Sequence, residues 1–162
     1  MAFPLSREVM NEALFFDDVE IGDHWRSPSR MIQQSDVLEF AELTGDHNPL
    51  HVDVEFARKT PFRRPIAHGL LGMSIVAGLG SRSPAMHTAA FTRILDWRFV
   101  NPIYIGDTVH VETEVLEKRP SGRRRGLIVW RRQLVNQENV VVQEGTSETL
   151  VMMTVGAKLL PR

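Results

Sequence analysis

The longest uncharged stretch of the chain runs from Pro65 to Ser81 and reads PIAHGLLGMSIVAGLGS. Between Gly69 and Gly80 nearly every side chain is apolar, and Ser74 is the exception. This pattern predicts a long helix over about residues 66–81 that is buried on all sides. Roughly 14 residues of it at about 1.5 Å each make a rod about 21 Å long, which is too short to span a bilayer, whose core needs about 20 apolar residues. We therefore expect other parts of the chain, rather than lipid, to enclose it.

Two shorter helices are expected before this segment. Ser35 is placed to cap a helix with an apolar stripe, and Gly45 is placed to end it. A second helical stretch, DVEFARKT, follows from residue 53 to residue 60 and stops before Pro61. The order predicted for the first half of the chain is helix, loop, short helix and buried helix.

After residue 88 the pattern changes from helical to extended. Residues 108–115, TVHVETEV, alternate apolar and polar side chains as a half-exposed strand does. The segments expected to be strands are 24–32, 88–100, 108–115, 126–136 and 140–155. Four of them follow one another, so we expect antiparallel pairing through short turns. The sequence thus predicts an α+β fold, with a curled antiparallel sheet of about five strands around the long helix.

The composition is typical of one globular domain, with 162 residues, 43% hydrophobic and 24% charged. We interpret residues 1–162 as a single domain and residues 1–15 as an N-terminal arm. The net charge of −1 gives no general attraction to nucleic acid or an anionic membrane, so neither is expected as a partner. The absence of cysteine excludes disulfides and thiol nucleophiles, and no signal-peptide core is evident, so we expect a cytoplasmic location.

The loop Gly45-Asp46-His47-Asn48-Pro49-Leu50-His51 is the candidate site for chemistry. It holds one carboxylate and two imidazoles within six positions, and Pro49 restricts the backbone on both sides. A rigid loop carrying Asp46 and His51 suits general acid–base catalysis. Two other interpretations stay open from spacing alone. Either these are ordinary turn and surface residues, or they bind a metal together with His68, although the spacing matches no standard zinc motif.

Residues 45–79, GDHNPLHVDVEFARKTPFRRPIAHGLLGMSIVAGL, resemble the MaoC-like dehydratases and (R)-specific enoyl-CoA hydratases. The signature of that family runs Gly-Asp-x-Asn-Pro-x-His and then, after a gap, Arg-Pro-Ile-x-His-Gly before an apolar helix. Both parts occur here at the family's spacing, and the stretches LDWRFVNPIYIGDTVHVETEVLEKRP and RGLIVWRRQLVNQENVVVQ resemble its later strands. The resemblance covers about residues 15–155. It implies the hot-dog fold, a long helix wrapped by an antiparallel sheet.

The resemblance also implies an activity. That activity is hydration of a trans-2-enoyl-CoA, or dehydration of a (3R)-3-hydroxyacyl-CoA, a hydro-lyase reaction of fatty acid metabolism with no metal or redox cofactor. By similarity, Asp46 and His51 share a catalytic water and transfer its protons. Gly69 stands at the start of the long helix, where amide N–H groups are unsatisfied, so its N–H is the expected contact for the thioester oxygen.

Further residues match the family in supporting positions. Asn48 is expected to brace the loop, and His68 either fixes the entrance of the helix or takes part in the reaction. Ser74 lies near the catalytic pair in some relatives, but here it is more simply interpreted as a core residue. The basic run Arg123, Arg124 and Arg125 is either a solvated turn or a site for the phosphates of coenzyme A.

The expected substrate partner is an acyl-CoA or an acyl-carrier-protein thioester. A hot-dog sheet leaves an edge strand that a second subunit usually covers, so the resemblance implies a homodimer or a dimer of dimers. Two alternative functions are a hot-dog acyl-CoA thioesterase and a noncatalytic acyl-binding subunit. The grouping of Asp46 and His51 ahead of the helix disfavours both alternatives.

Overall fold

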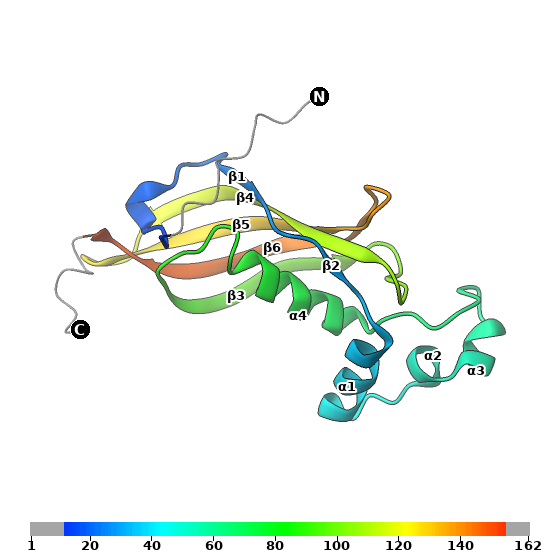
Figure 1. Ribbon diagram of the computed structural model, residues 1–162. Coiled ribbons are helices and arrows are strands. Elements are labelled where there is room, and N and C mark those ends of the chain that lie inside the picture. The colour runs from blue at the N-terminus through cyan, green and yellow to red at the C-terminus, as the bar shows by residue number, and fades with distance from the viewer. Residues whose placement is uncertain (1–11, 155–162) are drawn as a thin grey trace.

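The computed structural model describes residues 12–154, which form a six-stranded antiparallel sheet that curves over a long helix (Figure 1). The strands are β1 (His24–Arg26), β2 (Arg30–Met31), β3 (Thr88–Phe99), β4 (Thr108–Pro120), β5 (Arg125–Val135) and β6 (Val141–Met152). Their order in the sheet is β1-β4-β5-β6-β3, and β2 also pairs with β4. The predicted α+β architecture is confirmed, with six strands in place of about five.

The additional strand arises because the segment predicted as one strand over residues 24–32 is divided in two. Pro28 lacks the N–H that a continuous ladder would need. Beside it, the Oγ of Ser27 accepts a hydrogen bond from the backbone N–H of Val111 at 2.9 Å. A side chain thus replaces a backbone partner there, and β1 and β2 pair with separate parts of β4.

β3 does not pair with β4, its neighbour in the sequence. It pairs with β6, while β4, β5 and β6 form successive hairpins. The connection from β3 to β4 therefore passes the end of the sheet beside the segment that leads into the long helix. Ile66 bridges to Tyr104 there, and the N–H of Ala67 donates to the carbonyl oxygen of Ile103 at 2.8 Å. These contacts fix the start of the long helix against the sheet.

The helices are η1 (Phe16–Asp18), α1 (Gln34–Thr44), α2 (Pro49–Val52), α3 (Val54–Arg58) and α4 (Gly69–Gly80). The predicted long helix is α4, and it begins later than residue 66 because Ile66 and Ala67 bond to the connection before β4. Ser35 does not cap α1 but lies inside it. The cap position is Gln33, whose N–H donates to the carboxylate of Asp36 at 2.8 Å. Gly45 ends α1 as predicted, with a left-handed φ of 76°.

α4 is not buried on all sides, so that prediction is wrong for the single chain. Leu71, Ile75 and Val76 pack into the core with apolar side chains of β4 and β5. On the opposite side, Leu70 is 60% exposed, and the other exposed positions are Ser74, Ala77 and Gly78. The reason is that α1, α2 and α3 gather beyond one end of α4 instead of covering its outer face (Figure 1). Within residues 12–154, no helix is both long and apolar enough to cross a membrane.

A second core cluster lies at the other end of the sheet. Phe16, Trp25 and Trp130 are buried in it. Residues 1–11 of the predicted arm lie outside the described part of the chain, but the following residues pack on the molecule, since the ring of Phe15 stacks on that of His87 at 3.9 Å. The last predicted strand ends at Met152 rather than at residue 155, which also lies outside the described residues.

Candidate functional site

Asp46, His51 and His68 lie together at the amino-terminal end of α4. A carboxylate oxygen of Asp46 and one ring nitrogen of each histidine all lie within 4.8 Å of one another. The side chain of His68 is buried, that of His51 is half-buried and Asp46 is exposed. Residues from the end of α1, from α2 and from the start of α4 thus form one acid–base cluster that solvent can reach.

The loop holds this arrangement through local hydrogen bonds. The predicted rigid loop is partly helical, because Pro49 occupies the first position of α2. Asn48 caps this helix by accepting a hydrogen bond from the N–H of Leu50 at 3.0 Å, so it braces the loop. The Oδ1 of Asp46 accepts from the N–H of Asn48 at 3.3 Å. The carboxylate and His51 are therefore presented by a short, closed piece of backbone.

Two backbone carbonyl groups determine the tautomers of the histidines. The Nδ1 of His51 lies 2.8 Å from the carbonyl oxygen of Ile66, and the Nε2 of His68 lies 2.9 Å from that of Asp46. Because a carbonyl oxygen only accepts, each of these nitrogens carries the proton. The lone pairs are then on Nε2 of His51 and on Nδ1 of His68. The Nδ1 of His68 is buried and has no partner among residues 12–154.

The peptide N–H of Gly69 is at the first position of α4, next to His68. Amides in the first turn of a helix have no acceptor within the helix, and the helix dipole makes this end attractive to negative charge. The carbonyl oxygen of Gly69 accepts a hydrogen bond from the side chain of Gln143 at 2.9 Å, and Gln143 in turn accepts from the indole of Trp97 at 3.2 Å. The start of α4 is thereby anchored to β6 and β3.

Sequence reasoning missed Gln143 and Trp97. Gln143 is 2% exposed and holds Gly69 across 74 positions of sequence, so no local motif marks it. A polar side chain at an inward position of an apolar strand is the only sequence signal that could have drawn attention to it.

Ser74 is not a core residue. It is exposed, and its hydroxyl donates to the carbonyl oxygen of Leu70 within the helix at 2.8 Å. The prediction that it fills the core is therefore wrong, because Ser74 lies on the face of α4 that the sheet leaves open.

The arginines Arg123, Arg124 and Arg125 lie at the turn between β4 and β5, at the end of the sheet away from α1, α2 and α3 (Figure 1). The carbonyl oxygen of Arg124 accepts from the N–H of Met153, which confirms that this turn lies beside the end of β6. The structure therefore does not bring these arginines together with Asp46 and His51 of the same chain.

The same cluster has the donor set of a metal site. Asp46, His51 and His68 are the one group of carboxylate and imidazole side chains within residues 12–154 whose ligand atoms are close enough to hold an ion. Three protein ligands and an open position are typical of catalytic zinc. The geometry is thus compatible either with a metal or with a water molecule shared by the acid–base groups.

Comparisons with known proteins assign the chain to a family. A family model described as a MaoC like domain matches residues 18–135. The chain is 41% identical over 115 residues to a 3-hydroxybutyryl-CoA dehydratase of Methylorubrum extorquens, covering 70% of this chain and 71% of the relative. It is 37% identical over 102 residues to an (R)-specific enoyl-CoA hydratase of Aeromonas caviae, covering 62% and 74%.

The fold is also shared with a solved structure. An unliganded R-hydratase from Pseudomonas aeruginosa superposes with a TM-score of 0.71 at 28% identity, covering 86% of each chain. The expected hot-dog fold is confirmed. The matched region of the family model contains the whole cluster of Asp46, His51 and His68.

Proposed function

Because the chain belongs to the MaoC-like domain family, we propose that it is a hydro-lyase that reversibly hydrates a trans-2-enoyl-CoA to a (3R)-3-hydroxyacyl-CoA. The observation that carries the proposal is the grouping of Asp46 with His51 beside the first turn of α4. It supplies the groups that this reaction needs and contains no nucleophilic thiol or serine. Neither relative named above is a thioesterase.

Hydration requires two proton transfers. A base removes a proton from water as its oxygen attacks the β-carbon, and an acid delivers a proton to the α-carbon. Atoms that lie within 4.8 Å of one another can both hydrogen bond to one water molecule, so Asp46 and His51 are suited to orient and deprotonate it. The lone pair on Nε2 of His51 follows from the bond of its Nδ1–H to Ile66.

Negative charge develops on the thioester oxygen during the reaction. We assign the N–H of Gly69 to bind that oxygen, because this donor is fixed in position and lies at the positive end of α4. Losing one such donor typically costs about 2.7–4 kcal/mol of transition-state stabilisation. Gln143 and Trp97 are positioning residues, since they hold the carbonyl side of Gly69.

His68 contributes mainly by holding the backbone of Asp46. Its Nε2–H donates to the Asp46 carbonyl oxygen, and its ring lies 3.9 Å from that of His51. We propose that it fixes the distance between the loop and α4. Replacement of His68 would then displace the carboxylate even though His68 itself transfers no proton.

The thioester is carried by coenzyme A or an acyl carrier protein, and the phosphates of either carrier favour a basic surface beside the site. Arg63 and Arg64 are exposed cations in the segment that leads to Ile66, His68 and Gly69, and Arg64 lies over the ring of Tyr104 at 3.9 Å. We propose that these two arginines, rather than Arg123 to Arg125 of the same chain, contact the phosphates of coenzyme A or of an acyl carrier protein.

The activity is tested by mixing the full chain with trans-2-enoyl-CoAs of several lengths and recording loss of the conjugated thioester absorbance together with release of free thiol. The proposal expects alkene loss without thiol release.

Asp46→Asn and His51→Ala are each expected to lower kcat by at least about 10²-fold, the lower limit typical of well-placed acid–base groups. Unchanged activity after removal of metals with a chelator is expected in the wild type.

His47→Ala is the matched control, because His47 is an exposed imidazole in the same loop but outside the cluster. It should retain near wild-type kcat, and all variants should keep the wild-type circular dichroism. Thiol release would instead identify a thioesterase, and binding without either reaction a noncatalytic subunit. Turnover that survives both replacements would reject the assigned roles, and activity lost on chelation would identify a metal centre.

A further inference from the structure

The inner face of the sheet carries a second group of polar side chains with atoms that have no hydrogen-bond partner among residues 12–154. Four buried side-chain atoms in residues 12–154 lack a hydrogen-bond partner, and three of them are Oγ1 of Thr113, Nε of Arg132 and Oγ of Ser147. Thr113 pairs in register with Arg132 on the neighbouring strand, and Ser147 pairs with Trp130, two residues before Arg132. The three side chains therefore lie close together on β4, β5 and β6.

Arg132 is unusual among the arginines of residues 12–154. Its side chain is 7% exposed and lies over the ring of Trp130, with Cζ 5.8 Å from the ring centroid, but no acidic residue of the described chain forms an ion pair with it. The neighbouring Arg131, by contrast, points to the other face of β5 and pairs with Glu114 at 2.7 Å. Burial lowers the pKa of Arg132 to about 10, which leaves the guanidinium protonated at neutral pH. A buried cation without a counter-charge is costly, so this site is incomplete in the free chain.

Arg132 and Ser147 line a cavity of about 210 Å³ between α4 and the sheet. Its other walls include Ser74 of α4 but are mostly apolar, with Val76 of α4 and Ile94 and Trp97 of β3 among them. A mostly apolar cavity with a few polar groups is typical of a site for a ligand with an apolar body and a polar end.

The polar side chains of the cavity indicate the chemistry of the ligand's polar end. The guanidinium of Arg132 and the hydroxyl of Ser147 can both donate hydrogen bonds, and a carboxylate at neutral pH only accepts them while also neutralising the arginine. We propose that Arg132 and Ser147 bind a carboxylate at the distal end of the acyl chain, so that the preferred substrates are enoyl thioesters of dicarboxylic acids. This proposal rests on the proposed hydratase function and narrows its substrate class.

The position of the cavity agrees with this role. The acyl chain would begin at Gly69, where the thioester oxygen is bound, and run along α4. A β-carbon on Gly80, at the far end of the 12-residue helix, would lie 3.1 Å from the Cζ of Arg132. The helix is about 17 Å long and an extended chain advances about 3.5 Å per three bonds, which places the carboxylate roughly fifteen bonds from the thioester.

The test compares matched pairs of trans-2-enoyl-CoAs that have equal carbon number and end in a methyl group or a carboxylate, from four to about eighteen carbons. Wild-type protein is expected to prefer the carboxylate by about 10- to 100-fold in kcat/KM at its best length, the ratio that a charge-assisted hydrogen bond to a buried group supplies. Arg132→Met should abolish this preference, because kcat/KM should fall for the substrates that end in a carboxylate and stay unchanged for those that end in a methyl group. Ser147→Ala should reduce it by a smaller factor.

Arg131→Met is the matched control, because it removes an arginine from the same strand but from the opposite face, and it should keep the wild-type preference. Arg132→Met should fold, since an unpaired buried charge is replaced by an apolar side chain of similar length. If Arg132→Met does not fold, Arg132→Lys can be used instead. It retains the charge without the fork of donors and should reduce the preference for carboxylate-ended substrates.

The outcomes separate the two proposals. If no enoyl-CoA of either kind is hydrated, the proposed function itself fails. If methyl-ended substrates are hydrated as well as carboxylates and Arg132→Met leaves the ratio unchanged, the carboxylate site is rejected while the hydratase stands. A fall in molecular mass of Arg132→Met in solution, with an unchanged substrate ratio, would show that Arg132 pairs with a second copy of the chain and would also overturn the inference.

Discussion

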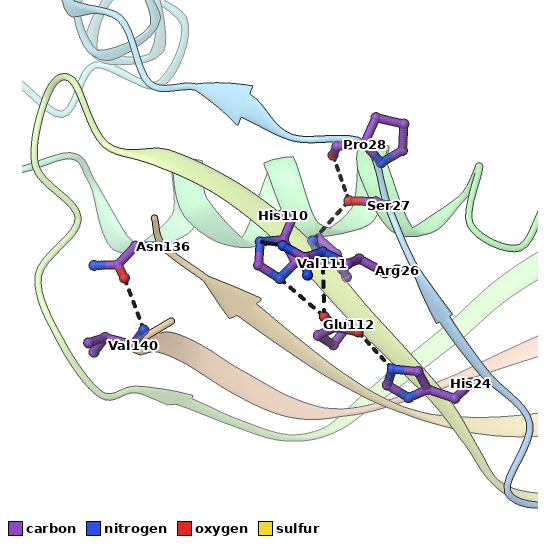
Figure 2. Close-up of polar contacts among 9 residues, drawn as sticks. All are labelled: His24, Arg26, Ser27, Pro28, His110, Val111, Glu112, Asn136 and Val140. Atoms are coloured by element: carbon purple, nitrogen blue, oxygen red, sulfur yellow. Dashed lines mark hydrogen bonds and ion pairs between the residues drawn. The ribbon is translucent and has the colours of Figure 1, made fainter. Parts of the chain in front are cut away.

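At the scale of single residues, the neighbours of an ionisable side chain determine its protonation, as His110 illustrates. His110 is 4% exposed on the face of β4 away from α4, beside Arg26 and Glu112 (Figure 2). Its Nε2 lies 3.1 Å from Glu112, whose other oxygen lies 2.7 Å from His24, and its Nδ1 lies 3.4 Å from the Arg26 guanidinium. Since Arg26 only donates, Nδ1 must accept, and His110 is the neutral Nε2–H tautomer.

Stability is therefore expected to fall in mild acid. Burial lowers the pKa of His110, and Arg26 lowers it further, although Glu112 acts in the opposite direction. Below the unfolded pKa of about 6.5 the unfolded chain binds a proton that the folded chain resists, so the free energy of unfolding decreases by up to about 1.4 kcal/mol per pH unit. Urea unfolding between pH 8 and pH 5 measures this slope.

The variant His110→Gln should flatten that slope, because it keeps a polar side chain and removes the titrating group. His47→Gln, which changes an exposed histidine, serves as its control and should leave the slope as it is. Equal slopes in wild type and His110→Gln would show that other groups produce the acid sensitivity.

At the scale of elements, α4 depends on close contact with the sheet at its first turns. A β-carbon on Gly72 would lie 2.6 Å from Cδ1 of Ile103 and even closer to the side-chain amide of Gln143. Both of these side chains are 2% exposed, so neither can move aside freely. The atoms that come closest to Gly72 are therefore side-chain atoms and not those of another backbone.

Gly72→Ala is expected to destabilise the protein by about 1–3 kcal/mol, because overpacking outweighs the gain in helix propensity of about 1 kcal/mol. It should also lower kcat, since displacing Gln143 releases the carbonyl group of Gly69. Gly78→Ala in the same helix is the control. No atom lies within 4 Å of its β-carbon position, so it should stabilise by about 0.5–1 kcal/mol. Chemical denaturation measures the free energy of unfolding of both variants. A Gly72→Ala variant that is more stable than the wild type would contradict this account.

At the scale of the whole molecule, the chain leaves one apolar edge uncovered. β3 is the last strand of the sheet, and Phe91, Leu95 and Phe99 on it are 51%, 45% and 54% exposed. The open face of α4 adds Leu70, at 60%. An unpaired edge strand with exposed apolar side chains is a surface that another chain can extend. We therefore propose that a homodimer forms through β3 and that the dimer covers the outer face of α4.

Leu95→Glu is expected to convert the protein to a monomer, because it places a charge on the uncovered edge. Light scattering measures the mass. Leu43→Glu introduces the same charge at an 82% exposed leucine of α1 and should leave the mass unchanged. A monomeric wild type, or a Leu95→Glu variant that keeps the wild-type mass, would reject β3 as the interface.

Much of this protein follows from its sequence alone. The apolar run before Ser81 predicts α4, the alternating valines of residues 109–115 predict a strand, and the spacing of Asp46, His51 and Gly69 identifies the family, because periodicity, turn chemistry and motifs are local properties of a chain. Tertiary structure decided the rest. The open face of α4, the contact of Gln143 with Gly69 and the unpaired charge of Arg132 depend on which strands become neighbours, and β3 joined β6 rather than the strand that follows it. Pairings between distant segments bury or expose a side chain without leaving any local pattern, which is why only the folded chain reveals them.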